Sequence, residues 1–583
     1  MNLRKFSPPA SFALALAVVL TLTSSHAIGQ APSADLADSI YLNGTIVTVN
    51  DKQPTVEAIA VRGGNILAVG TKAEVLYHKG SATRVIDLQG KTLLPGFVDG
   101  HSHFGGNVFA WGSPTLYPPP VGTVESIADI QKILRDYIAQ KDIPPGQAVS
   151  ASGYDDSLLK ERRHPNRADL DAITTDRPLC LHHVSGHLVT CNSAAFKLAG
   201  ITRDTPDPPG GRIFHDPATG EPSGVLGDRA SGLIGRIFPP RSLEDAKKNF
   251  DAVQQYYASF GYTTVQEGAT SGAVVRLLRE ENEAGNLKLD VISYPTGLDV
   301  DRTIADQGIK IGKEYDRHLK FEGVKFFGDG SPQGKTAFLR EPYFHPPADA
   351  DAEYHGLALL TQDQFNAAYD KAFAHGWQVQ THCNGDACID RLLTAVALAE
   401  KKYGPGDWRP VVIHSQVVRR DQLDKYVDLK IVPSYFEAHT FYWGDWHRDE
   451  TLGPARAPFI SPLHTSLDKG IVFSIHSDAP VTPPNALFLY WAAVNRLTRS
   501  GKVLGPAERV DALTALKALT IWPAYQQFDE KIKGTLEPGK YADFVVLAEN
   551  PLTVDPLHIK DIQVVETIKN GETLWKRGAV AAH

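Results

Sequence analysis

Cysteine, methionine and excess charge are all scarce in this chain. Only four of its 583 residues are cysteine and Met1 is the single methionine, so the fold cannot depend on a dense disulfide framework. Cys180 and Cys191 flank a predicted strand and turn and could pair, whereas Cys383 directly follows a candidate metal ligand and is predicted to be a buried free thiol. The formal net charge of −8 argues against nucleic acid as a partner.

Long apolar runs are absent after the N-terminus, so we predict no transmembrane segment in the rest of the chain. At the N-terminus, Arg4 and Lys5 precede an apolar stretch from Ala10 to about Leu22, and small residues follow, as in a secretory signal peptide. A membrane anchor is the alternative, but the stretch is shorter than the roughly 18 residues that a span requires. We therefore predict a signal peptide over residues 1–31, no stable membrane anchor, and a periplasmic or secreted protein.

Two β-rich segments lie at opposite ends of the chain. Residues 32–92 alternate like short strands around the turn signal Gly63-Gly64, and residues 534–583 do so around Asn570-Gly571. Each segment alone has too few strands to bury a core. We predict that the two segments pair into one small β-sandwich domain.

Between these ends, residues 93–533 alternate buried-looking strands with helix-like stretches, a pattern that favours a parallel sheet. The predicted strands are Leu93–Val98, Thr263–Glu267, Leu289–Tyr294, Gly323–Phe327, Gln378–His382, Val411–His414, Ile431–Tyr435 and Val472–Ser474. Eight strands in this alternation predict an α/β fold, a (β/α)8 barrel of the TIM type. The segment from about 104 to 241 is too long for one loop and is predicted to be an insertion after the first strand.

Metal-ligating side chains follow the ends of several predicted strands. The candidate ligands are His101, His103, Lys325, His382, His414 and Asp478. The first two are separated by one residue, and side chains at i and i+2 of a strand point to the same side. Because a barrel brings the carboxyl ends of its strands to one mouth, the set suits one or two divalent cations such as zinc. Lys325 fits only as a carbamate formed with CO2, because a free ammonium group cannot ligate.

Each candidate ligand also has a plainer explanation. His382 and His414 could be core histidines hydrogen-bonded to the backbone. Lys325 could pair with Asp329, and Asp478 could cap the turn before Pro480. The metal site is favoured by the joint pattern, in which five of the eight predicted strands each deliver one element of the set.

The order of motifs extends this pattern over nearly the whole chain. The motifs are Leu94–His103, Gly153-Tyr154-Asp155-Asp156, Ser185-Gly186-His187, Asn192–Ala195, Val324-Lys325 with Asp329-Gly330-Ser331, His382 with Gly385-Asp386, His414-Ser415-Gln416, Ser477-Asp478-Ala479-Pro480 and Gly534–Asp543. As a set they resemble the amidohydrolase superfamily, specifically its YtcJ-like (amidohydrolase 3) branch, which includes N-substituted formamide deformylases. The resemblance implies a metal-dependent hydrolase, usually a zinc enzyme, that acts on amide-like C–N bonds. By position, the six candidate ligands match the metal-centre residues of the family.

The predicted reaction is hydrolysis by metal-activated water, with Asp478 accepting the proton of the water and passing it to the leaving nitrogen. Further candidates for substrate binding are Tyr154, Asp155, His187, Asp329, His439 and Trp443. The alternatives for these residues are a turn histidine, a helix cap and simple aromatic packing. The chain departs from the family at His476, where many relatives have glycine, and at Cys383-Asn384.

Three functions remain open from the sequence. The first is hydrolysis of an amide, formamide, carbamate or N-acyl bond in a small-molecule substrate. The second is the same fold acting as an esterase, lactonase or deaminase, reactions that the superfamily also includes. The third is a non-catalytic regulatory or binding protein, because fold alone does not fix function. The complete ligand set favours an enzyme, and a homodimer is an expectation of the family resemblance alone.

Overall fold

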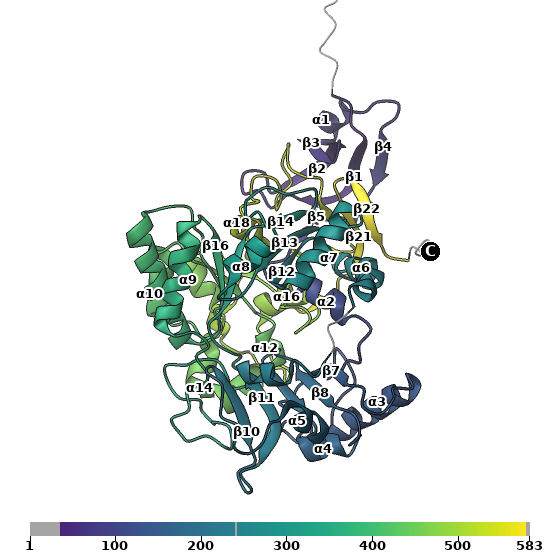
Figure 1. Ribbon diagram of the computed structural model, residues 1–583. Helices are drawn as coiled ribbons and strands as arrows, with labels where there is room; N and C mark the ends of the chain where they lie inside the picture. The colour runs from purple at the N-terminus through teal and green to yellow at the C-terminus, as the bar shows by residue number, and fades with distance from the viewer. Residues whose placement is uncertain (1–34, 239–241, 579–583) are drawn as a thin grey trace, which may run out of the picture.

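The computed structural model describes residues 35–238 and 242–578 (Figure 1). The predicted signal peptide, residues 1–31, lies outside the described residues. A sheet built from both chain ends, a barrel and an inserted domain follow one another from top to bottom in the view of Figure 1. Among the described residues, no helix is both long and apolar enough to cross a membrane.

The two ends of the chain share one hydrogen-bonded sheet. Its strands are β1 (Ser39–Val47), β2 (Thr55–Arg62), β3 (Asn65–Gly70), β4 (Arg84–Asp87), β5 (Thr92–Pro95), β20 (Phe544–Leu547), β21 (Val564–Lys569) and β22 (Glu572–Lys576). The order is β22-β21-β20-β5-β1-β2-β3, with β4 paired to β1, and the antiparallel β5–β20 pair joins the two ends. Gly63-Gly64 and Asn570-Gly571 turn two of its hairpins, all at positive φ.

The barrel consists of eight parallel strands. They are β6 (Phe97–Val98), β12 (Tyr262–Thr270), β13 (Asp290–Pro295), β15 (Gly323–Phe327), β16 (Gln378–Cys383), β17 (Val411–His414), β18 (Val432–Tyr435) and β19 (Ser474–Ile475). One run pairs β6 with β12 and β13, to which the short β14 (Leu319–Phe321) is added, and a second run extends from β15 to β19. A parallel bridge from Thr296 to Lys325 joins the runs on one side. On the other, the Asp478 amide donates to the His101 carbonyl.

The first predicted barrel strand is divided in the structure. Residues Thr92–Pro95 belong to the sheet of the chain ends, and only Phe97–Val98 enter the barrel. Gly96 lies between them, and a Cβ added there would lie 2.4 Å from the Thr263 side chain. The sequence predicted one strand because the whole stretch is apolar, whereas the close approach at Gly96 makes the chain change sheets.

Helices cover the outside of the barrel and its connections. They are α6 (Leu243–Ala258), α7 (Gly272–Glu283), α8 (Val300–Asp306), α9 (Gln362–Ala374), α10 (Asp386–Tyr403), α11 (Arg420–Asp428), α12 (His439–Tyr442), α13 (Gly444–Trp446), α14 (Gly453–Arg456), α15 (Leu463–Asp468), α16 (Ala486–Asn495), α17 (Ala512–Lys517) and α18 (Ile521–Gln526); α1 (Lys72–Leu76) belongs to the end sheet. Local sequence fixes several starts: the Ser242 side chain caps α6, and Thr361 forms a capping box with Gln364 at α9.

The inserted domain follows β6 and has its own sheet, at the bottom of Figure 1. The helix α2 (Phe104–Ala110) packs against α6 and β12 of the barrel, and the elements of the domain itself are α3 (Ile127–Gln140), β7 (Val149–Tyr154), α4 (Arg167–Asp171), β8 (Leu179–His183), β9 (Leu188–Cys191), α5 (Ser193–Ala199), β10 (Gly211–His215) and β11 (Pro222–Asp228). The sheet order is β10-β11-β9-β8-β7. Cys180 and Cys191 lie opposite each other on β8 and β9 and form a disulfide.

Candidate metal centre

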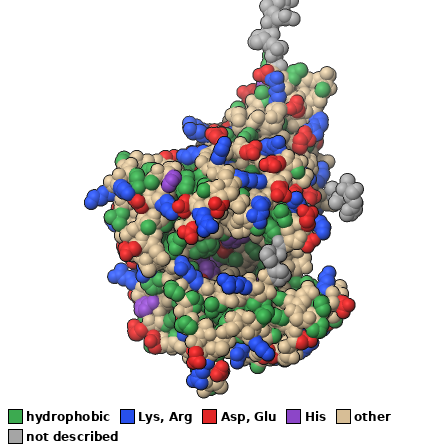
Figure 2. Space-filling model, in the orientation of Figure 1, with side chains coloured by type: hydrophobic (Ala, Val, Ile, Leu, Met, Phe, Trp, Pro, Cys, Tyr) green, Lys and Arg blue, Asp and Glu red, His purple; other side chains and the backbone are tan. Residues whose placement is uncertain are grey.

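A cavity of about 620 Å³ opens at the carboxyl ends of the barrel strands, where the inserted domain faces the barrel. Figure 2 shows this face of the molecule hollowed, with histidine side chains (purple) inside the hollow. All six candidate ligands line the cavity: His101, His103, Lys325, His382, His414 and Asp478. The barrel therefore brings together residues that lie far apart in the sequence.

Asp478 is the centre of this group. Its Oδ1 lies 3.5 Å from His101 Nε2 and 3.3 Å from His103 Nε2, and its Oδ2 lies 3.9 Å from His414 Nε2. Burial alone would raise the pKa of Asp478, but the neighbouring histidines, with His103 first, outweigh it and hold the pKa below its usual value. The carboxylate therefore stays ionised and presents both oxygens to the imidazoles.

The orientation of His101 follows from its hydrogen bond to Gln266 on β12. The Gln266 Oε1 atom lies 2.7 Å from His101 Nδ1. Because an amide oxygen only accepts, Nδ1 carries the proton and the lone pair of Nε2 faces the cavity. This is the tautomer that a metal-ligating histidine needs.

Lys325 lies beside His101 at the bottom of the cavity. Its Nζ is 3.1 Å from His101 Nε2, and its side chain is fully buried. Burial lowers the pKa of Lys325 to about 7. A substantial fraction of the amine is therefore uncharged near neutral pH, and an uncharged amine is the form that reacts with CO2.

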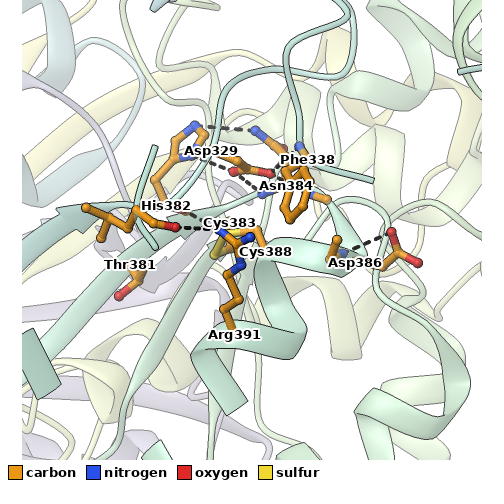
Figure 3. The surroundings of a disulfide bond; sticks show 12 residues. Asp329, Phe338, Thr381, His382, Cys383, Asn384, Asp386, Cys388 and Arg391 are labelled. Atoms are coloured by element: carbon orange, nitrogen blue, oxygen red, sulfur yellow. Dashed lines mark hydrogen bonds and ion pairs between the residues drawn. A yellow bond between two sulfur atoms is a disulfide. The ribbon is translucent and has the colours of Figure 1, made fainter. Parts of the chain in front are cut away.

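His382, near the end of β16, lies against Asp329 in the loop that follows β15 (Figure 3). Its Nδ1 lies 3.3 Å from Asp329 Oδ1, and Asp329 also accepts the backbone N–H groups of Asn384 and Gly385. Below it, Cys383 and Cys388 form a disulfide, which corrects the prediction of a free thiol at Cys383. The pairing was missed because the two cysteines belong to different elements, the end of β16 and the first turn of α10.

Two histidines absent from the predicted ligand set support the ring positions. The His187 Nε2 atom lies 3.0 Å from His382 Nε2, and its Nδ1 lies 2.6 Å from Asp228 Oδ1. His476 Nε2 lies 3.1 Å from His414 Nδ1. Both contacts bring a further imidazole against a candidate ligand, and His187 was predicted only as a substrate residue.

The donor atoms fit a divalent cation. The ligand atoms of His101, His414 and Asp478 all lie within 4.8 Å of one another. Asp478 Oδ1 is buried, and among the described residues it has no hydrogen-bond donor. Imidazole nitrogens with a carboxylate oxygen form a typical zinc donor set. A buried carboxylate oxygen without a donor is costly unless a cation compensates it.

The predicted substrate residues separate into two groups. His187 lines the cavity, whereas Tyr154, Asp155, Asp329, His439 and Trp443 are not among its lining residues. Trp443 Nε1 donates to Asp155 Oδ2 at 2.7 Å, so the indole N–H and this carboxylate oxygen are hydrogen-bonded to each other. Their positions indicate packing between the inserted domain and the barrel, and the sequence could not reveal this pairing across distant segments.

Sequence reasoning missed several residues that support the site. Gln266 and Glu267 lie within β12, and the Glu267 carboxylate accepts the Gly105 N–H while lying 4.0 Å from His103 Nδ1. Asp228, at the end of β11, holds His187. Asp228 ends a strand, which was an available signal, whereas Gln266 and Glu267 lie inside β12 and carry no such signal.

Comparisons with known proteins agree with the geometry. The model of the amidohydrolase family matches residues 84–575. The chain is 27% identical to YtcJ of Bacillus subtilis, over 92% of this chain and 99% of that protein. It is 27% identical to the N-substituted formamide deformylase of Arthrobacter pascens, over 93% and 99%. A solved structure of an uncharacterized metal-dependent hydrolase from Pyrococcus furiosus superposes with a TM-score of 0.67 at 25% identity, covering 88% of this chain and all of that one. The chain belongs to the amidohydrolase family of metal-dependent hydrolases.

Proposed function

We propose that this protein hydrolyses a C–N bond of the amide or formamide type in a small molecule. The observation that carries the proposal is the convergence of six ligand-type side chains on one cavity, with an Asp478 oxygen left without a donor. A cavity of about 620 Å³ suits a small-molecule substrate. The N-substituted formamide deformylase among the relatives supports this bond type.

The metal ligands in this proposal are His101, His103, Lys325, His382, His414 and Asp478, with Lys325 as a carbamate. We assign zinc, because imidazole and carboxylate donors suit it. A divalent cation held there would acidify a water molecule and polarise the scissile carbonyl. The neutral Lys325 amine, favoured by burial, would react with CO2 to give the carbamate and release one proton.

Asp478 is the general base in this proposal. Burial raises the pKa of Asp478, but His103, His476 and Lys325 outweigh it and hold the pKa below its usual value, so the ionised carboxylate can accept a proton at neutral pH. After attack on the carbonyl carbon, the same carboxyl group would return the proton to the leaving nitrogen. The Asp478 amide donates to the His101 carbonyl, which fixes the residue at the barrel mouth.

The wall of the cavity above these residues is mainly apolar. Leu298, Phe327, Leu359 and Val481 contribute to it. We infer a substrate with an apolar group attached to the nitrogen or to the acyl carbon. Two disulfides also support export to an oxidising compartment, as the N-terminal sequence predicts.

Metal analysis combined with a substrate panel tests this function. Purified mature protein is analysed for zinc and assayed with N-substituted formamides, simple amides, esters and lactones. We expect zinc in the wild type, its loss in Lys325→Ala and His101→Ala, and turnover confined to C–N substrates. Asp155→Asn serves as the matched control, because Asp155 is a buried acid outside the cavity. A wild type that stays metal-free and inactive after reconstitution would overturn the proposal.

A further inference from the structure

The loop that carries Asp478, residues 477–482, is tied to the first barrel strand by its backbone. The Asp478 amide donates to the His101 carbonyl at 3.3 Å, and the Ala479 carbonyl accepts the His103 amide at 2.9 Å. Within the loop, the Val481 amide donates to the Asp478 carbonyl at 2.8 Å. Asp478 has a φ of 53°, a left-handed conformation that is uncommon for residues other than glycine. The loop therefore depends on its contacts to keep this backbone conformation.

A further contact to this loop comes from the inserted domain. Tyr117 lies in the segment between α2 and α3, and its hydroxyl group donates to the Pro480 carbonyl at 2.6 Å. Among the described residues, this hydroxyl is the one hydrogen-bond donor to that carbonyl. Tyr117 and Pro480 both line the cavity. The inserted domain thus holds the loop two residues away from the proposed general base.

Tyr117 is itself held by strand β7. The Leu116 amide donates to the Ser152 carbonyl at 2.8 Å, and the Ser152 amide donates to the Pro114 carbonyl at 3.2 Å. Leu116 is fully buried in the apolar core of the inserted domain. The segment that carries Tyr117 therefore belongs to the packed part of this domain, and the position of its hydroxyl group is set by that packing.

Gly153, near the end of β7, leaves the space in which the Tyr117 ring lies. A Cβ added to Gly153 would lie 2.8 Å from Cε1 and 2.9 Å from Cδ1 of that ring. Gly153 also has a φ of 97°, which favours glycine. In the motif Gly153-Tyr154-Asp155-Asp156, it is the glycine that lines the cavity. The motif therefore reaches the site by accommodating Tyr117, rather than through its acidic residues.

We propose that Tyr117 is a positioning residue for Asp478. Its ring rests against Gly153, and its hydroxyl group holds the Pro480 carbonyl, so that the loop presents the Asp478 carboxylate to the cavity. The inserted domain thereby contributes to the reaction as well as to the cavity wall. The inference rests on the proposed function for the role of Asp478 as general base, whereas the anchoring contact itself requires neither metal nor substrate.

Hydrogen exchange in the metal-free full-length protein tests the anchor. Mass spectrometry with fragmentation that resolves single amides follows the Val481 amide, which donates to the Asp478 carbonyl. Tyr117→Phe keeps the ring and removes only the hydroxyl group. We expect this amide to exchange about 5- to 10-fold faster in Tyr117→Phe, the size expected for the loss of one hydrogen bond, and at least as fast in Gly153→Ala. Unchanged exchange in Tyr117→Phe would refute the anchor.

The matched control for this measurement is Tyr343→Phe. The Tyr343 hydroxyl group also donates to a backbone carbonyl, that of Ala337 at 2.9 Å, but Tyr343 is not among the residues that line the cavity. We expect this variant to leave the exchange of the Val481 amide at the wild-type rate. Equally faster exchange in Tyr343→Phe and Tyr117→Phe would contradict a specific anchor.

Turnover of a formamide substrate by the zinc-loaded protein gives a second readout. Tyr117→Phe should lower kcat by about 5- to 10-fold at a KM close to that of the wild type, because the ring still shapes the cavity while Asp478 is less well positioned. Zinc content should be unchanged, and Tyr343→Phe should match the wild type in both constants. A higher KM at an unchanged kcat would overturn the positioning role. A wild type without zinc or turnover would instead refute the proposed function, while hydrogen exchange still decides the anchor.

Discussion

Two buried clusters of aspartate and histidine lie close together in this protein and differ in one respect. In the barrel, Asp478 Oδ1 has histidines around it but no hydrogen-bond donor. In the inserted domain, Asp156 Oδ1 lies 3.0 Å from His183 Nε2, and His183 Nδ1 contacts Ser185 Oγ at 2.8 Å. Both clusters have ligand atoms at metal-like spacing. The cluster of the inserted domain thus completes its hydrogen bonds within the protein, whereas the candidate metal centre leaves one buried carboxylate oxygen without a donor among the described residues.

The largest difference between the clusters should follow from removing the charge of Asp478. We expect Asp478→Asn to lower kcat by about a thousandfold, within the range of a lost general base. The measurement is turnover of the best formamide substrate together with zinc content. Asp156→Asn is the matched control and should leave kcat close to the wild-type value. A similar loss of turnover in both variants would remove the distinction.

A smaller effect on catalysis should come from Asp228, which holds His187 against His382. Asp228→Ala removes the acceptor of His187 Nδ1–H, and we expect kcat/KM to fall by about 10-fold, typical of a residue that orients another. Zinc content should remain that of the wild type. Loss of zinc in this variant would show that His187 itself binds the metal.

The cluster of Asp156, His164 and His183 in the inserted domain should contribute to the stability of the protein in acid. Burial raises the pKa of Asp156, but His164 and His183 outweigh burial and lower it to about 2. Since the unfolded value is about 3.9, the stabilisation is present above about pH 4 and is lost as the pH falls toward 2. The shift corresponds to roughly 2.5 kcal/mol. Urea unfolding at pH 6 and pH 3 should show a smaller difference in Asp156→Asn than in the wild type, and an unchanged difference would contradict this account.

Removing each of the two disulfides should give the smallest difference between the two regions, measured as zinc affinity. The Cys383–Cys388 bond adjoins His382, whereas Cys180–Cys191 joins strands of the inserted domain. We expect the double variant Cys383→Ala/Cys388→Ala to weaken zinc binding by a few-fold. This is the size of effect expected when a residue that supports a ligand, rather than a ligand itself, is changed. The matched pair Cys180→Ala/Cys191→Ala should lower only the melting temperature. Chelator competition and thermal unfolding measure the two effects, and equal zinc affinities for both double variants would oppose this assignment.

Much of the barrel could be predicted from the sequence, because the barrel strands are short apolar runs that end in polar residues. His382 and His414 could be placed at one mouth for that reason alone. Gln266 could not be recognised, because a polar residue in a buried element gives no sign of its partner. The Asp155–Trp443 contact joins positions that no local pattern connects. Gly96 was missed since a change of sheet leaves the apolar run unbroken.

The pairing of β5 with β20 has a consequence for the order in which the chain is made. Leu94 pairs with Val545, so the edge of β5 finds this neighbour only after nearly the whole protein has left the ribosome. Until then an apolar strand beside the nascent barrel presents unpaired backbone groups, which invite association with other chains. A message truncated just after Lys533 would encode every proposed catalytic residue and still yield an aggregation-prone product. Such a product would lack β20, the strand that pairs with this edge of β5.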